Sequence, residues 1–232
     1  MKIKYGMILA AGLGSRMQSL TKQTPKPLIK LGNRNLLDRA IELLINHGIE
    51  EIAINVHYLA NQIKDFISEK KYKVKIIISD EQSSLLDTGG GILQATKSFE
   101  DKPFIVINPD TLWNKNYSNE IEKLEELFFK KKKPCLLLVN KNLSFDSSFK
   151  GDFNLSANKV SRNSNNHFIF TGLQILDRGV FNFTKNKIFS MNEIWNNLIN
   201  DKRLLAIESN QKFYHINTKE MYGKILNLNI ID

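Results

Sequence analysis

Strand-like and helix-like segments alternate through the first 140 residues of this chain of 232 residues. Short apolar runs predict strands, and longer amphipathic segments predict helices. The predicted strands are 5–9, 51–56, 74–79, 104–108 and 135–139, and the predicted helices are 36–47, 59–69, 91–97 and 119–131. Because parallel strands need crossover connections, which are usually helical, this alternation predicts βαβ units around a largely parallel sheet.

The pattern changes from about residue 141. Strands predicted at 152–155 and 167–176 follow each other without a full helix between them, which predicts antiparallel strands added to the sheet. Further elements are predicted at 192–200 (helix), 204–209 and 213–216 (strands) and 218–228 (helix). With no repeat and no linker, we expect one α/β domain over residues 1–232, with a Rossmann-like, mixed, mostly parallel sheet and helices on both faces.

A glycine-rich segment follows the first predicted strand. Residues 9–17 read LAAGLGSRM, and residues 25–28 read PKPL. Gly12 and Gly14 let main-chain N–H groups approach an anion closely, while Arg16 and Lys26 supply positive charge. The dinucleotide motif G-x-G-x-x-G fails at Met17, and no G-K-[ST] triplet completes a P-loop. The segment therefore predicts a polyphosphate site of another kind.

Polar clusters follow three of the predicted strands. The glycine segment follows the first strand, residues 79–82 (SDEQ) follow the third, and residues 108–110 (NPD) follow the fourth. Ligands of open parallel sheets bind beyond the carboxyl ends of the strands. We therefore expect the three clusters to meet in one cleft.

Composition narrows the choice of partners. The net charge is +9, but the lysines are spread along the chain and no aromatic-basic platform accompanies them, so a nucleic-acid partner is the weakest alternative. No apolar run is long enough for a membrane span, and the short run at 7–11 leads into the glycine segment rather than a cleavage site. The single cysteine, Cys135, lies in an apolar strand and suits a reducing compartment. We expect a cytoplasmic protein without a membrane partner, as a monomer or small homo-oligomer.

The motifs resemble those of the sugar-1-phosphate nucleotidyltransferases, and most closely the N-acetylmuramate-1-phosphate uridylyltransferases of peptidoglycan recycling in the bacterial cell wall. The resemblance rests on residues 9–16, 24–28, 87–92 (DTGGGI) and 108–110, with 151–153 and 170–172 as later elements. It implies a fold of the nucleotide-diphospho-sugar transferase type. It also implies that a nucleoside triphosphate, UTP first, and a sugar 1-phosphate, N-acetylmuramate 1-phosphate first, form a nucleotide sugar and pyrophosphate.

The resemblance also assigns roles to residues, with a nucleotide-binding part at about 1–140 and a sugar-binding part at about 141–232. Catalytic roles fall on Arg16, Lys26 and Asp110. Nucleotide contacts fall on Ala10, Ala11, Gly12, Leu13, Gly14, Ser15, Arg16, Lys26, Glu81, Gln82, Thr88, Gly89 and Gly90. Sugar contacts fall on Asn108, Asp152, Thr171 and Gly172, and metal binding falls on Asp110 and His215.

The chemistry of these side chains agrees with the implied roles. Arg16 and the loop backbone suit the β- and γ-phosphates, and Lys26 suits the α-phosphate and the attacking phosphate. Asp110 suits Mg²⁺, with Mn²⁺ as the alternative, because hard cations take carboxylate and phosphate oxygens. The amide of Gln82 matches the donor and acceptors of a uracil edge. His57 and His167 have no partners spaced for catalysis or metal binding.

The C-terminal motif departs from the family pattern W-x-D-x-G-T, because residues 213–218 read FYHINT. His215 stands at the position of the metal-binding aspartate and Asn217 at that of the glycine, and imidazole suits Mn²⁺ or Zn²⁺ better than Mg²⁺. Pro109 also replaces a more usual small residue. These departures leave open a guanylyltransferase for mannose or heptose 1-phosphate, a cytidylyltransferase for choline phosphate, and a catalytically silent sugar-nucleotide-binding regulator.

Overall fold

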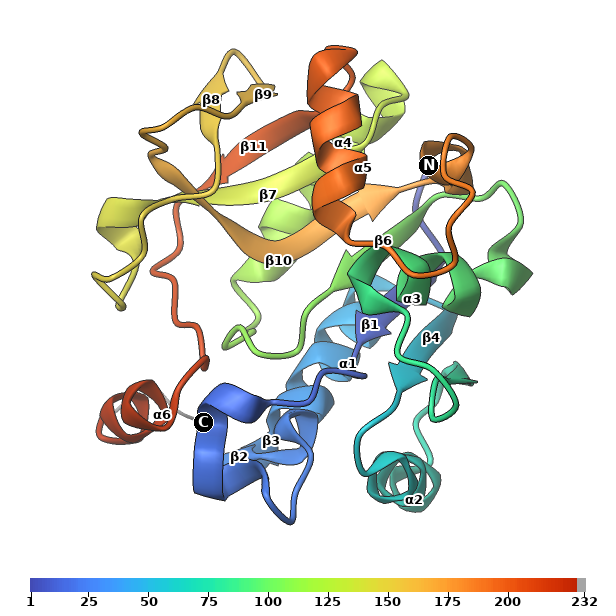
Figure 1. Ribbon diagram of the computed structural model, residues 1–232, viewed down its shortest axis with the longest axis vertical. Coiled ribbons are helices and arrows are strands. Elements are labelled where there is room, and N and C mark those ends of the chain that lie inside the picture. Colours follow the sequence, from blue (N-terminus) through green and yellow to red (C-terminus); the bar gives the residue numbers. More distant parts are fainter. Residues whose placement is uncertain (229–232) are drawn as a thin grey trace.

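The computed structural model describes residues 1–228, which form a nine-stranded sheet flanked by helices (Figure 1). The strands in spatial order are β5 (Lys75–Asp80), β4 (Glu51–Val56), β1 (Tyr5–Leu9), β6 (Phe104–Ile107), β10 (Phe168–Leu176), β7 (Cys135–Asn140), β11 (Leu205–Ser209), β9 (Lys159–Ser161) and β8 (Asn154–Ser156). This mixed, mostly parallel sheet confirms the predicted fold class. Residues 229–232, the end of the predicted sugar-binding part, lie outside the described residues.

The first half of the sheet is parallel and the second half is mixed. β1 pairs in parallel with β4 and β6, so that Tyr5 lies opposite Glu51 and Phe104. β10 runs antiparallel between β6 and β7, while β11 continues in parallel beside β7. The predicted antiparallel strands after residue 141 are therefore present, and the longest of them, β10, lies inside the sheet rather than at its edge.

Helices cover both faces of the sheet because the buried strands are apolar on both sides. The helices are α1 (Leu36–His47), α2 (Ala60–Lys70), α3 (Asp87–Ala95), α4 (Tyr117–Lys131), α5 (Met191–Asn200) and α6 (Lys219–Leu226). In β4, Ile52 and Ile54 belong to the core shared with α1, α2 and α4. Ala53 between them belongs to the opposite core, shared with α3 and α5. With both faces covered by helices, the ends of the strands are where a ligand can reach the sheet.

Helix α1 shows how local sequence sets an element. The Asn35 side chain accepts a hydrogen bond from the Asp38 backbone N–H at 2.7 Å, and Gly48 ends the helix with a φ of 98°. The predicted helix at 36–47, ending at Gly48, is confirmed. A hairpin of β2 (Lys30–Leu31) and β3 (Arg34–Asn35) precedes it. These strands were not predicted, because two residues are too few to show a period.

Two predicted elements are corrected. The helix predicted at 91–97 begins earlier, at Asp87, so the three glycines lie inside α3 rather than in a loop. The strand predicted at 213–216 forms only isolated bridges, Thr111 with His215 and Ser144 with Phe213. Its backbone is shared between two separate loops and therefore never pairs along a single strand.

Residues 1–228 include no helix long and apolar enough to cross a membrane.

Candidate active site

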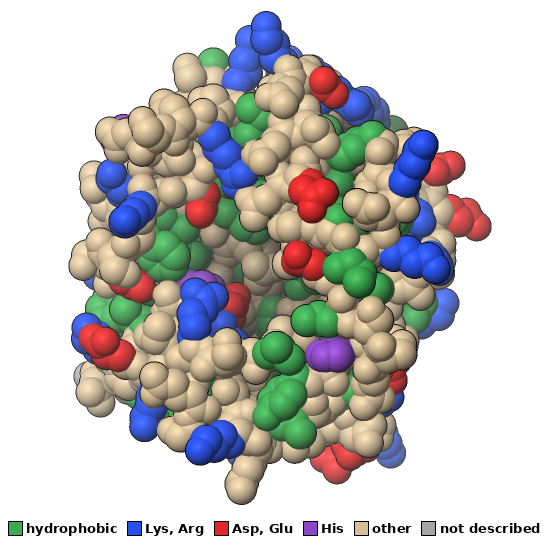
Figure 2. All heavy atoms as spheres, viewed as in Figure 1, with side chains coloured by type: hydrophobic (Ala, Val, Ile, Leu, Met, Phe, Trp, Pro, Cys, Tyr) green, Lys and Arg blue, Asp and Glu red, His purple; other side chains and the backbone are tan. Residues whose placement is uncertain are grey.

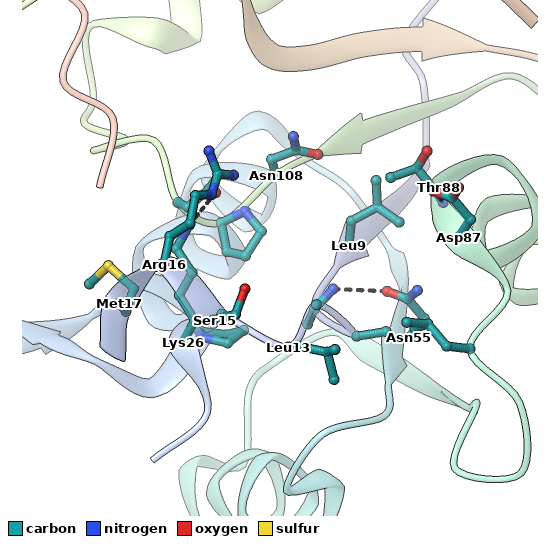
Figure 3. Close-up of a pocket in the computed structure, with 18 of the residues that line it drawn as sticks. Leu9, Leu13, Ser15, Arg16, Met17, Lys26, Asn55, Asp87, Thr88 and Asn108 are labelled. Atoms are coloured by element: carbon teal, nitrogen blue, oxygen red, sulfur yellow. Dashed lines mark hydrogen bonds and ion pairs between the residues drawn. The ribbon is translucent and has the colours of Figure 1, made fainter. Parts of the chain in front are cut away.

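A pocket of about 630 Å³ opens at the carboxyl ends of β1 and β6. Figure 2 shows the hollow near the middle of this face, with acidic, basic and histidine side chains near its rim. In Figure 3, Arg16 and Lys26 lie on one side of the pocket, and Asp87 and Thr88 lie on the other. The glycine segment and the 108–110 segment both line it, as the sequence predicted for the cleft.

The glycine segment turns sharply at Gly14, which has a φ of 65°. A Cβ at this position would lie 3.0 Å from both Lys26 and Thr21, so the close packing here also favours a residue without a side chain. The backbone carbonyl of Gly14 accepts hydrogen bonds from the Met17 N–H at 2.9 Å and from the Thr21 hydroxyl at 3.0 Å. These contacts start a 3₁₀ helix, Ser15–Thr21, and leave the Arg16 side chain exposed at the pocket.

Three predicted residues meet at Asp110. The Lys26 ammonium lies 2.5 Å from Asp110 Oδ2, and His215 Nε2 lies 3.1 Å from the same oxygen. Burial alone raises the pKa of the Asp110 carboxyl, but Lys26 and His215 outweigh burial and hold that pKa well below its usual range. Asp110 is therefore ionised at neutral pH.

Backbone pairing brings His215 to Asp110. The N–H of Ile216 donates to the carbonyl of Asp110 at 2.8 Å, and the N–H of Leu112 donates to the carbonyl of Tyr214 at 2.9 Å. The His215 ring stacks on Phe213, with ring centres 5.8 Å apart and an angle of 11° between the planes. This packing fixes the ring orientation, so that Nε2 faces the carboxylate.

Two buried oxygens beside the pocket accept no hydrogen bond within the described residues. They are Oδ1 of Asp110 and Oδ1 of Asn217, and both residues line the pocket. The amide nitrogen of Asn217 donates to Asp146 at 3.3 Å, which leaves the oxygen side of the amide unused. Buried oxygens of this kind suit a ligand that brings positive charge, because an unpaired buried acceptor is costly.

Glu81 is held by the protein itself. It is 2% exposed, and its carboxylate accepts from the Asn55 amide at 2.7 Å and from the Leu86 N–H at 3.0 Å. Asn55 in turn accepts from the N–H of Ala10 at 2.8 Å, which ties β4 to the start of the glycine segment. Glu81 lines the pocket, whereas Gln82 does not. Glu81 thus connects Asn55 of β4, and through it the start of the glycine segment, with the residue that precedes α3.

The glycines of α3 face another part of the chain. The N–H groups of Gly89 and Gly90 donate to the carbonyl of Phe189 at 2.9 and 3.1 Å. A Cβ on Gly90 would lie 2.2 Å from the carbonyl oxygen of Lys187. The Thr88 hydroxyl accepts from the Met191 N–H at 2.9 Å. Residues 187–189 therefore lie where a ligand was expected to approach these glycines. Of Thr88, Gly89 and Gly90, only Thr88 lines the pocket.

The four residues expected to bind sugar separate into two groups. Asn108 lines the pocket. Thr171 is buried and donates to the carbonyl of Leu137 at 2.9 Å. Gly172, with a φ of 92°, accepts from the Asn108 N–H, and Asp152 accepts from the Phe170 N–H at 2.9 Å. The last three hold β10 and the Asn108 loop in place and do not line the pocket.

The remaining predicted residues of the glycine segment, Ala10 to Arg16, all line the pocket, and His215 reaches it through Asp110. Several lining residues were not predicted as site residues: Asn55, Leu85, Asp87, Ile188 and Asn217. Asp87 stands within a motif that the sequence did single out. Asn217 stands in the C-terminal motif, at the position of the family's glycine. Asn55, Leu85 and Ile188 carry no local signal, because only the fold brings them to the pocket.

The comparisons with known proteins agree with this fold and pocket. The model of the family described as "Nucleotidyl transferase" matches residues 5–141, which is more than half of the chain. The chain belongs to the nucleotidyl transferase family and is an enzyme of this family. The predicted resemblance to the sugar-1-phosphate nucleotidyltransferases is thereby confirmed.

Among particular relatives, an N-acetylmuramate alpha-1-phosphate uridylyltransferase of Caulobacter vibrioides is 28% identical, over 92% of this chain and 91% of that protein. The protein of the same name in Neisseria meningitidis is 38% identical over 52% of this chain and 53% of its own length. Other relatives are named as guanylyltransferases of mannose 1-phosphate or of a heptose 1-phosphate.

Among solved structures, a UDP-glucose pyrophosphorylase of Acinetobacter baumannii aligns with a TM-score of 0.79. The alignment covers 97% of this chain and 92% of the pyrophosphorylase chain, at 15% sequence identity. This likeness shows the shared fold.

Proposed function

We propose that this enzyme transfers a uridylyl group from UTP to a sugar 1-phosphate, with N-acetylmuramate 1-phosphate as the first candidate, and releases pyrophosphate. The observation that carries the proposal is the junction of Lys26 and Asp110, 2.5 Å apart, beside the glycine segment in one pocket. Two anionic substrates must meet in this reaction, so a site for it needs positive charge at the point where they join.

The roles of the residues follow from that need. The backbone of Leu13 to Ser15 and the Arg16 guanidinium would bind the phosphates that leave as pyrophosphate. Lys26 would neutralise the α-phosphate and the attacking phosphate oxygen, and its place between Pro25 and Pro27 restricts its backbone. Catalysis in such a site consists mainly of positioning and charge stabilisation. Asn108 would bind the sugar, since it is the one predicted sugar residue that lines the pocket.

A divalent cation fits the oxygens beside Lys26. Asp110 Oδ1 and Asn217 Oδ1 would hold it, because both are buried oxygens without another partner in the described chain. When bound, the cation would neutralise phosphate charge. Oxygen ligands suit Mg²⁺, with Mn²⁺ as the alternative. His215 would position Asp110 rather than bind the metal itself, since its Nε2 contacts Asp110 Oδ2.

The substrate assignment is supported by the two uridylyltransferase relatives, one of which spans nearly the whole chain. The guanylyltransferase relatives support a second assignment, in which GTP and mannose or heptose 1-phosphate replace UTP and the amino sugar. With the first assignment we also propose a role in peptidoglycan recycling in the cytoplasm, for a chain of one domain that acts as a monomer or small homo-oligomer.

The test is pyrophosphate release across a matrix of UTP, GTP, CTP and TTP with N-acetylmuramate, glucose, mannose and heptose 1-phosphates and choline phosphate, in Mg²⁺ and in Mn²⁺. The proposal predicts the fastest release from UTP with N-acetylmuramate 1-phosphate. Faster release from GTP with a mannose or heptose 1-phosphate would replace it by the second assignment. No release in any combination would reject both.

A further inference from the structure

Asp87 is an exposed carboxylate in the pocket that the roles above leave without a function. It is the first residue of α3, and in Figure 3 it lies beside Thr88, across the pocket from Arg16 and Lys26. Its φ is 60°, a left-handed conformation that residues other than glycine rarely adopt. Eight other non-glycine residues of the described chain also have a positive φ, but among these nine only Asp87 lines the pocket.

The neighbouring contacts account for this conformation. The N–H before Asp87, that of Leu86, donates to Glu81, and the hydroxyl of the next residue, Thr88, accepts from the Met191 N–H. The Thr88 N–H donates to Asp87 Oδ1 at 2.5 Å. Both flanks of Asp87 are thus fixed, and Oδ2 makes no hydrogen bond within residues 1–228. Oδ1 of Asp87 is therefore hydrogen-bonded to the backbone of the next residue, and Oδ2 is available to a ligand.

Charge decides what this oxygen can bind. Asp87 forms no ion pair among the described residues, and Arg16 and Lys26 stand on the other side of the pocket. A lone carboxylate repels phosphate groups but accepts hydrogen bonds from neutral hydroxyl groups. Of the parts of a nucleotide, those that suit a place beside Asp87 are therefore uncharged and carry hydrogen-bond donors. Asn55 and Glu81, which line the same side of the pocket, are occupied with each other.

We propose that Asp87 binds the ribose hydroxyls of the nucleotide and selects ribonucleotides over 2′-deoxyribonucleotides. The inference rests on the proposed function and adds a specificity residue to it. Carboxylates bind ribose hydroxyls in this way in other nucleotide-binding folds. A carboxylate at this end also orients the triphosphate toward Arg16 and Lys26, because the opposite orientation would place phosphate beside like charge. Ribose is favoured over the sugar substrate because Asp87 lies beside Thr88, which is expected to contact the nucleotide. Asn108, which is expected to contact the sugar, belongs instead to the loop after β6.

The test compares binding of UTP with dUTP, and of GTP with dGTP, by calorimetry without sugar phosphate. The wild type should bind the better ribonucleotide at least about tenfold more tightly than its deoxy form, the scale of one hydrogen bond to a charged group. Asp87→Asn should reduce this ratio, and Asp87→Gly, which keeps the left-handed backbone without strain, should bring it to about one. Asp65→Asn, the same change of charge at an exposed residue of α2 outside the pocket, should leave the ratio unchanged.

The outcomes separate the two proposals. If the wild type binds no nucleotide, the proposed function fails as well. If it binds nucleotides but does not distinguish the deoxy forms, or if both Asp87 variants keep the wild-type ratio, the role of Asp87 is rejected while the proposed function stands. Thermal unfolding of each variant checks that the fold is intact.

Discussion

At the scale of single residues, Asp110 combines burial with two basic neighbours. Its side chain is 20% exposed and that of Lys26 is 14% exposed, so each charge depends on the other inside the pocket. Removing one partner leaves the other poorly compensated. Lys26 would also contact both substrates in the proposed reaction. The pair therefore has a structural and a catalytic function, which different measurements separate.

Replacing Lys26 by Ala or Asp110 by Asn should slow turnover by at least about a hundredfold. The first change removes positive charge where negative charge gathers, and the second removes the carboxylate that would hold the cation and that pairs with Lys26. Rates of pyrophosphate release at saturating substrates give the measurement, and circular dichroism checks the fold. Lys22→Ala, an exposed lysine outside the pocket, is the matched control and should keep the wild-type rate. A near-normal rate in either pocket variant would refute the role assigned to that residue.

At the scale of secondary-structure elements, α3 shows that a glycine cluster beside a ligand site can serve the protein's own packing. Gly89 and Gly90 admit the backbone of residues 187–189, about 100 residues away along the chain. Gly91 admits the Asn55 and Glu81 side chains, and a Cβ there would lie 2.7 Å from the Asn55 amide. These contacts hold Thr88 and Asp87 at the pocket wall.

Replacing Gly90 by Ala should lower the free energy of unfolding by about 1–3 kcal/mol, because the new Cβ would meet a backbone carbonyl that cannot move away cheaply. Gly223→Ala is the matched control in α6, where a Cβ meets nothing within 4 Å, and it should raise stability by about 0.5–1 kcal/mol. Urea unfolding measures both. Equal effects of the two substitutions would contradict the packing role of Gly90.

The sequence predicts those elements whose signals are local. Tyr5 to Leu9 form an apolar strand followed by glycines, and Asn35 and Gly48 delimit α1, so these features are readable in order. The start of α3 cannot be predicted from local sequence, because it depends on contacts with residues 187–191. The path of residues 213–217 cannot be predicted either, because it depends on contacts with the loops at 110–112 and 143–145. That the side-chain oxygen of Asn217 has no hydrogen-bond partner is likewise visible only in the folded chain, where the amide nitrogen donates to Asp146.

At the scale of the whole molecule, the fold brings together a site from distant parts of the chain. Parallel strands β1, β4 and β6 end at the same edge of the sheet, which places the glycine segment, Asn55 and Asn108 around one pocket. The segment after β11 then returns to Asp110, bringing His215 and Asn217. This convergence, rather than any single motif, supports the joining of two phosphates as the reaction.

Transfer of the nucleotidyl group is the central claim, and the fate of a labelled α-phosphate tests it most directly. With UTP carrying ³²P at the α-position, together with the sugar 1-phosphate that reacts fastest, the label should appear in a nucleotide sugar while unlabelled pyrophosphate is released in equal amount. Labelled UDP with release of a single phosphate, or labelled UMP without sugar attached, would show cleavage at another bond or transfer to water. Either result would contradict the account.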